Sequence, residues 1–287
     1  MTVPAISFEV FPPRSLDASF HLWDTVHTLA PLAPRFFSVT YGAGGSTQKL
    51  TQEAAQILRK QSGLPVAAHL TCVGASKADV IATADAYARA GVSDIVALRG
   101  DPPKGECFAP HPEGFADSCG LVEALAQDGR FTIRVGAYPE SHPDAANADQ
   151  NVEWLQAKID AGADEAVTQF FFDPETFLRF RDACAAKGLA DKLTPGILPV
   201  TNWASTKGFA ERCGASVAPD LAQGFERAAR EERGDLFALA HATELCDTLI
   251  CEGVERLHFY TLNRPELTRQ VCRALGITAE SAIRNVA

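Results

Sequence analysis

Short runs of alternating apolar and polar residues recur along this chain, and longer segments between them repeat an apolar residue every three or four positions. A period of two is typical of β-strands and a period near 3.6 of α-helices. The first pattern predicts eight strands, at residues 6–10, 35–40, 66–71, 94–99, 132–138, 165–172, 196–200 and 257–262. The second predicts helices at residues 16–29, 48–61, 77–90, 147–161, 174–187, 203–213, 219–230, 235–252 and 265–275, with a further helix behind the loop at 101–116.

Eight strands, most of them separated by one helix, favour a (β/α)8 TIM barrel of the α/β class. The 287 residues suit one such barrel and contain no low-complexity linker, so we expect a single domain over residues 1–287, with extra helices before the last strand. An open doubly wound sheet is the alternative. Its dinucleotide fingerprint is incomplete here, because Thr47 stands where the G-x-G-x-x-G pattern that begins at Gly42 needs its last glycine.

The first predicted strand carries a carboxyl group on its polar face. Phe8 and Val10 alternate there with Ser7 and Glu9, and Pro12 ends the strand shortly afterwards. Burial of a carboxyl group favours its protonated form, which suits a group that must donate a proton. The structural alternative is a carboxylate that pairs with a buried arginine or is solvated at the end of the strand.

Polar side chains also occupy the carboxyl ends of most other predicted strands, which is where barrel enzymes place their active sites. The side chains that can hydrogen-bond or titrate there are Glu9, Thr40, Tyr41, His69, Arg99, Asp101, Tyr138, Gln169, Asn263 and Arg264. Such a set predicts a site for a large polar ligand.

Each of these positions also has a structural alternative. His69 could be a hydrogen-bonded core histidine, and Arg99 could simply pair with Asp101. Gly100 between them favours a close approach of some other group to the backbone. The three phenylalanines at 170–172 could be core, although three consecutive side chains cannot all face the same way, so some should offer a stacking surface.

Composition argues against several classes of function. The net charge of −10 and the lack of a Lys/Arg block argue against nucleic-acid binding. No leader pattern and no apolar run of about 18 residues is present, so we expect a soluble cytoplasmic protein without a membrane partner. The eight cysteines lack Cys-x-x-Cys or His-x-x-x-His spacing, which argues against a metal site. No strand end carries the lysine of a Schiff-base aldolase, so a bound cofactor is the better expectation.

Several sequence motifs span nearly the whole chain. They are Ser7-Phe-Glu-Val-Phe-Pro-Pro, Ser38-Val-Thr-Tyr-Gly-Ala-Gly-Gly-Ser, Ala68-His-Leu-Thr-Cys, Leu98-Arg-Gly-Asp-Pro-Pro, Ala137-Tyr-Pro-Glu, Thr168-Gln-Phe-Phe-Phe-Asp, Pro195-Gly-Ile-Leu-Pro-Val and Phe259-Tyr-Thr-Leu-Asn-Arg. In sequence and in order they closely resemble the methylenetetrahydrofolate reductase family, in the short bacterial type that consists of the catalytic barrel only.

The resemblance implies a barrel that binds FAD non-covalently and works by ping-pong hydride transfer. NAD(P)H, with NADH favoured, would reduce the flavin, and 5,10-methylenetetrahydrofolate would then become 5-methyltetrahydrofolate. Glu9 would be the general acid on folate N10, and Asp101 would stabilise the developing cation. A homo-oligomer is also expected.

The resemblance carries further roles to matching residues. Those that would contact FAD are Thr40, Tyr41, Ala43, His69, Arg99, Gly100, Asp101, Ala116, Tyr138, His142, Asn151, Trp154 and Lys158. Those that would contact the substrates are Gln169, Ser205, Phe209 and Arg264, the last on the glutamate tail of the folate.

The chain departs from the family's pattern at four of the positions around this expected site. Asn151, Trp154 and Ala157 replace the Asp, Asn and Arg that the family commonly shows to the FAD tail, and Ser205 replaces a common Gln. Losing the arginine should weaken FAD binding, whereas stacking of Trp154 on the adenine would offset that loss. Two other functions stay open: another FAD-dependent TIM-barrel oxidoreductase, or a non-catalytic protein that binds folate or flavin.

Overall fold

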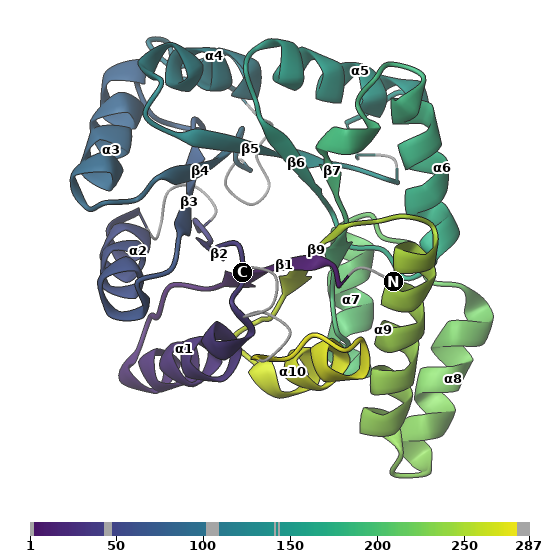
Figure 1. Ribbon diagram of the computed structural model, residues 1–287. Helices are drawn as coiled ribbons and strands as arrows, with labels where there is room; N and C mark the ends of the chain where they lie inside the picture. The colour runs from purple at the N-terminus through teal and green to yellow at the C-terminus, as the bar shows by residue number, and fades with distance from the viewer. Residues whose placement is uncertain (1–2, 43–47, 102–108, 141, 143, 280–287) are drawn as a thin grey trace.

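Parallel strands form a ring surrounded by helices in the computed structural model, which describes residues 3–42, 48–101, 109–140, 142 and 144–279 (Figure 1). The strands are β1 (Ala5–Val10), β2 (Phe37–Val39), β3 (Val66–Thr71), β4 (Asp94–Leu98), β5 (Thr132–Ala137), β6 (Glu165–Thr168), β7 (Leu193–Thr194), β8 (Gly196–Ile197) and β9 (Arg256–Tyr260). All pair in parallel, in the order β7-β6-β5-β4-β3-β2-β1-β9-β8. The predicted (β/α)8 barrel is confirmed.

The seventh predicted strand was wrong in detail. Instead of one strand at 196–200, the chain forms β7 and β8 on either side of Pro195. Proline has no backbone N–H to donate to a ladder, but the Pro195 carbonyl accepts a hydrogen bond from His258 N at 3.0 Å. Because β7 pairs with β6 and β8 pairs with β9, this segment closes the ring.

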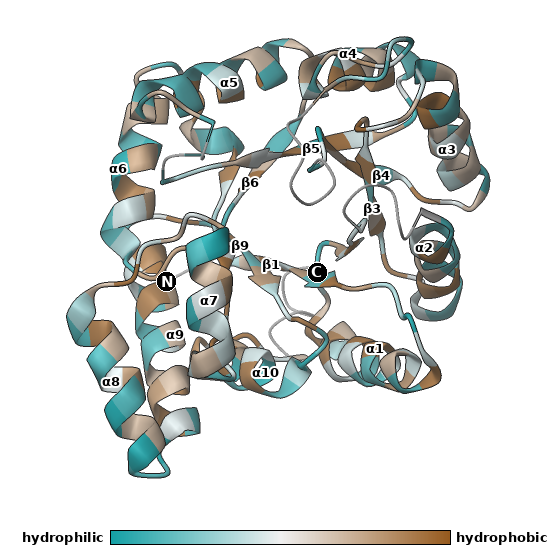
Figure 2. Ribbon diagram, turned by 180° about the vertical axis from the view of Figure 1, so that it is seen from behind, coloured by the Kyte–Doolittle hydropathy of each residue, from teal (hydrophilic) through white to brown (hydrophobic). Residues whose placement is uncertain are grey.

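The predicted helices are present, with ends shifted by one or two residues at most. They are α1 (Leu16–Leu29), α2 (Gln48–Ser62), α3 (Lys77–Arg89), α4 (Ser118–Asp128), α5 (Ala148–Asp160), α6 (Pro174–Ala185), α7 (Trp203–Arg212), α8 (Pro219–Arg230), α9 (Gly234–Cys251) and α10 (Pro265–Ala274). The extra helices α7 to α9 lie beside the ring before the last strand (Figure 1). The far end of the α8–α9 pair is hydrophilic (Figure 2).

Alternation along the strands separates the two faces of the ring. Phe8 is fully buried, with ring centroids 5.5 Å from Phe37 and 6.0 Å from Phe259 on the neighbouring strands. Its neighbours Ser7 and Glu9 therefore face the barrel interior. Packing of apolar side chains on the outer face of the sheet therefore fixes the strands whose polar side chains face the interior.

A buried network of charges fills the interior near the amino ends of the strands. The Arg134 guanidinium donates to Asp94 and to Glu165, and Arg35 binds Glu165 through two bonds of 2.8 and 2.9 Å. Burial raises the pKa of Glu165, but hydrogen bonds from Arg35 and Thr194 and the charges of both arginines outweigh it and lower that pKa to about 2. The network lies below the cavity described next.

Candidate active site

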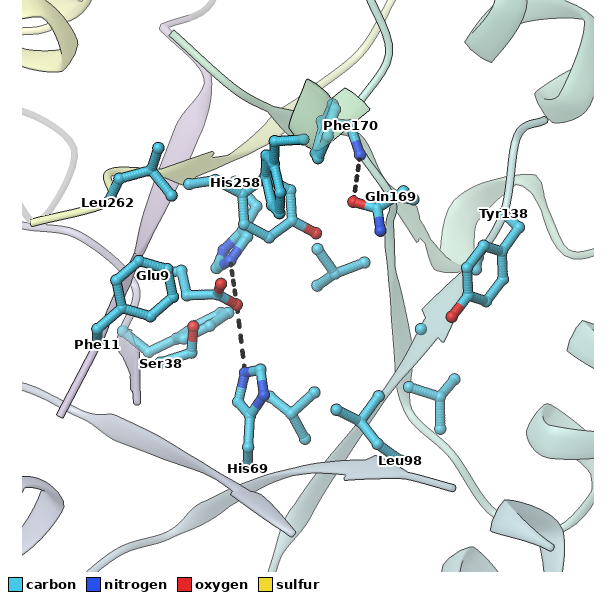
Figure 3. Close-up of a pocket in the computed structure, with 18 residues that line it drawn as sticks. Glu9, Phe11, Ser38, His69, Leu98, Tyr138, Gln169, Phe170, His258 and Leu262 are labelled. Atoms are coloured by element: carbon cyan, nitrogen blue, oxygen red, sulfur yellow. Dashed lines mark hydrogen bonds and ion pairs between the residues drawn. The ribbon is translucent and has the colours of Figure 1, made fainter. Parts of the chain in front are cut away.

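A cavity of about 240 Å³ opens inside the barrel above that network (Figure 3). Its lining comes from β1 to β6 and β9, from residues that flank these strands, and from one residue of α7. These residues include Glu9, Phe11, Phe36, Ser38, His69, Leu98, Gly136, Tyr138, Gln169, Phe170, Phe209, His258, Tyr260 and Leu262. The cavity therefore gathers Glu9, His69, Tyr138, Gln169 and Phe209, five of the residues expected from sequence.

Glu9 lies between two histidines on the wall of this cavity (Figure 3). Its Oε2 atom is 3.3 Å from Nε2 of His69 and 4.0 Å from Nε2 of His258, and 14 % of its side chain is exposed. Glu9 is thus neither paired with a buried arginine nor freely solvated. A single carboxylate oxygen faces two imidazole nitrogens that can accept or donate a proton.

His258 is a site residue that the sequence analysis missed. It is buried, and its Nδ1 is 2.7 Å from the hydroxyl of Ser7 on the paired strand. Burial lowers its pKa to about 4, although the Glu9 carboxylate opposes that shift. His258 is therefore neutral near pH 7. It lies inside β9, away from the strand ends where the sequence analysis looked for site residues.

Tyr260 forms the wall next to these groups. Its hydroxyl donates to the Thr168 carbonyl at 2.8 Å, and burial raises the pKa of that hydroxyl well above its usual value. A Cβ atom at Gly196 would lie 2.2 Å from the Thr168 oxygen and 2.5 Å from the tyrosine ring. Glycine is required at 196 for this tyrosine to pack across the barrel seam.

A second cavity of about 360 Å³ adjoins the first and shares Leu98, Gly136 and Tyr138 with it. It gathers another group of residues expected from sequence, namely Arg99, Gly100, Asp101, Tyr138, His142, Trp154 and Lys158. Asp117 and Cys119 also line it and were not foreseen. Because Asp101 lines this cavity and Glu9 the first, the two expected catalytic carboxylates belong to adjoining cavities.

Both Arg99 and Gly100, at the end of β4, make close contacts within the chain. Arg99 pairs with Asp144 at 3.0 Å, on a loop that the sequence pattern did not connect with it. Gly100 has φ +85°, and a Cβ there would lie 2.5 Å from Cγ1 of Val73. The group that approaches its backbone is therefore a neighbouring side chain of this chain, so packing alone is enough to require glycine.

A third cavity of about 500 Å³ shares Phe11 and Leu262 with the first and contains Thr40 and Arg264. Its base is held by Asn263, whose side chain accepts from Phe11 N at 2.9 Å and donates to Phe11 O at 3.1 Å. This pairing joins the ends of β1 and β9. It places the Arg264 guanidinium at the outer rim, 3.3 Å from the Thr201 hydroxyl.

The comparisons with known proteins agree with this geometry. The family described as methylenetetrahydrofolate reductase matches residues 2–276. The 5,10-methylenetetrahydrofolate reductase of Escherichia coli (strain K12) is 40% identical over 273 residues, which cover 95% of this chain and 90% of that protein. The chain belongs to the methylenetetrahydrofolate reductase family.

Other relatives extend the comparison. The 5,10-methylenetetrahydrofolate reductase of Pectobacterium carotovorum subsp. carotovorum is 40% identical over 96% of this chain and 92% of its own. Methylenetetrahydrofolate reductase (NADH) 1 of Arabidopsis thaliana is 33% identical over 97% of this chain and 49% of its own. A Clostridium thermocellum protein that binds two copies of 5-methyl-5,6,7,8-tetrahydrofolic acid is 13% identical, with a TM-score of 0.59 over 96% of both chains, which shows a shared fold.

Other residues that the family resemblance placed in the site make contacts within the chain or lie at its surface. The Asn151 side chain is buried and donates to Glu140 O at 3.1 Å. Ser205 is exposed, and its hydroxyl donates to Asn202 O at 3.1 Å at the start of α7. Tyr41 is partly buried, which raises its pKa to about 12, Ala116 is exposed, and Ala43 lies outside the described residues.

Within the described ranges, no group of three or more His, Cys, Asp or Glu side chains is arranged to hold a metal ion. In the same part of the chain, no helix has both the length and the apolarity that a membrane crossing requires.

Proposed function

We propose that this chain reduces 5,10-methylenetetrahydrofolate to 5-methyltetrahydrofolate, with FAD as a non-covalent cofactor and NADH as the reductant. The observation that carries the proposal is the position of Glu9. It is a shielded carboxyl group on the wall of a cavity large enough for one planar ring system, and two imidazoles face it. Family membership supports the reaction, and the name of the Arabidopsis relative supports NADH.

The second cavity fits a flavin nucleotide by its chemistry. Three aromatic rings, Tyr138, His142 and Trp154, stand on one side of it, and Arg99 and Lys158 supply positive charge. Its junction with the first cavity would let a bound ring reach both. When bound there, FAD supplies the two-electron chemistry that the side chains lack.

Glu9 is suited to hold the proton that folate N10 requires. Its Oε2 atom lies 3.3 Å from His69 and 4.0 Å from His258, and the hydroxyl of Ser7 holds the His258 ring at 2.7 Å. From this position on the cavity wall, Glu9 would donate a proton as the substrate ring opens.

The opposite wall would orient the substrates. The Gln169 side chain accepts from Phe170 N at 3.0 Å, and Phe209 stacks on Phe170 with centroids 5.3 Å apart. A pterin or a nicotinamide would lie against these rings. In a ping-pong exchange the nicotinamide and the folate would occupy this wall in turn.

An anaerobic assay tests the proposal. Purified protein supplied with FAD and NADH should convert 5,10-methylenetetrahydrofolate to 5-methyltetrahydrofolate, identified by mass. NADH oxidation without methyltetrahydrofolate would instead indicate another flavin-dependent oxidoreductase. Binding of folate or flavin without any turnover would indicate a non-catalytic protein.

A further inference from the structure

Glu140, in the loop that follows β5, binds a segment that lies 76 residues further along the chain. Its carboxylate accepts hydrogen bonds from Ser216 N, at 3.1 Å to Oε1 and 3.0 Å to Oε2, and another from the Ser216 hydroxyl. Hydrogen bonds to an ionised acceptor are roughly twice as strong as bonds between neutral groups. Glu140 therefore joins the loop after β5 to the loop between α7 and α8.

Both sides of this contact are fixed to buried parts of the barrel. On one side, the buried Asn151 side chain on α5 donates to the Glu140 carbonyl oxygen at 3.1 Å. On the other side, Ala215 N donates to Ala210 O at 3.0 Å, and both alanines are buried. The carboxylate of Glu140 thus ties the end of α7 to the loop after β5 through short contacts.

Two rings on the wall of the first cavity belong to the segments that this contact joins. Tyr138 lies two residues before Glu140, and Phe209 lies in the last turn of α7. β6 lies between β5 and β7 in the sheet, and Phe170, just after its carboxyl end, stacks on Phe209 with centroids 5.3 Å apart. The position of α7 therefore sets where Phe209 stands on the wall against which the substrates would lie.

We propose that Glu140 is a positioning residue for Phe209, because it holds the end of α7 and so keeps that ring at the wall of the first cavity. The inference rests on the proposed function, which assigns this wall to the nicotinamide and the folate in turn. Since one ring would serve both substrates, loss of Glu140 should weaken the binding of both. A side chain that contacted one substrate directly would weaken only that one.

A double-mutant cycle on FAD-loaded protein tests whether Glu140 acts through Phe209. Glu140→Ala should raise the KM for NADH and for 5,10-methylenetetrahydrofolate, each about 2- to 150-fold. In a Phe209→Ala background the same change should have almost no further effect. Ser216→Ala, which keeps the backbone bonds, and Glu140→Gln, which removes the charge, should have smaller effects of the same kind. Glu153→Ala, which removes an exposed glutamate on α5, is the control and should change neither KM.

Hydrogen–deuterium exchange tests the contact itself without using enzyme activity. The Ser216 amide and the amides at the end of α7 should exchange faster in Glu140→Ala than in wild-type protein, whereas those of α1 should not. Unchanged exchange, additive effects in the cycle, or a raised KM for only one substrate would overturn the positioning role. If wild-type protein did not turn over the folate, the proposed function would fail and the positioning role with it, while exchange would still report on the contact.

Discussion

His258 and Glu9 approach each other inside the barrel, with Nε2 of the imidazole 4.0 Å from Oε2 of the carboxyl group. Their strands are adjacent and parallel, and Ser7, which pairs with His258 in register, binds the other nitrogen of the ring. Burial keeps the His258 imidazole neutral near pH 7. We expect this arrangement to matter for both stability and proton donation.

His258 should make the protein less stable in mild acid. A histidine whose pKa is about 4 when folded and 6.5 when unfolded binds more protons in the unfolded state between those values. Its contribution is fully present above about pH 6.5 and is lost as the pH falls towards 4. From about pH 7 to pH 5 the loss should be about 2 kcal/mol in the free energy of unfolding.

Urea unfolding of wild-type protein and His258→Asn at both pH values measures this effect. The variant should lose less stability between them, whatever its stability at pH 7. Equal losses in the two proteins would mean that His258 does not carry the acid sensitivity.

Arg134 should be a major contributor to stability. It is 4 % exposed and is bound to both Asp94 and Glu165, so Arg134→Met would leave the buried Asp94 with the Ser93 hydroxyl but without its cationic partner. We expect a loss of about 3–5 kcal/mol in the free energy of unfolding. Arg130→Met removes an exposed arginine paired with Asp85 and should cost less than about 1 kcal/mol. Similar losses in both variants would contradict a structural role for the network.

Arg264 should bind an anionic part of the folate and not the nicotinamide. Losing one charge-assisted hydrogen bond costs about 1.5–3 kcal/mol, so Arg264→Ala should raise the folate KM about 10- to 150-fold. The KM for NADH should be nearly unchanged. Arg269→Ala, which removes a surface arginine paired with Glu266 at 2.8 Å, is the control. An unchanged folate KM would exclude the contact.

The strands could be predicted because apolar and polar residues alternate along them. In β1, Phe8 packs on one face of the sheet and Glu9 faces the barrel interior. The sequence pattern did not predict that strand residues also precede Pro195. It also continued the strand to residue 200, whereas the chain leaves the sheet after Ile197. Candidate site residues at strand ends could be named from the sequence because barrel enzymes place their active sites at the carboxyl ends of the strands.

Contacts between distant segments were not predictable in this way. His258 lies inside a strand, and its role depends on the register with Ser7. The pairing of Arg99 with Asp144 depends on the path of a loop. Neither the register nor the loop path is encoded in local periodicity.

The two half-reactions of Glu9→Gln test the central claim most directly. Anaerobic stopped-flow measurements on FAD-loaded protein would follow flavin reduction by NADH, and then flavin reoxidation by 5,10-methylenetetrahydrofolate. Glu53→Gln, on the surface of α2, is the control. If Glu9 is the acid that protonates the folate, the first rate should stay near wild type and the second should fall about 10²- to 10⁴-fold. An equal fall in both rates, or no fall in the second, would contradict the role of Glu9 as the proton donor.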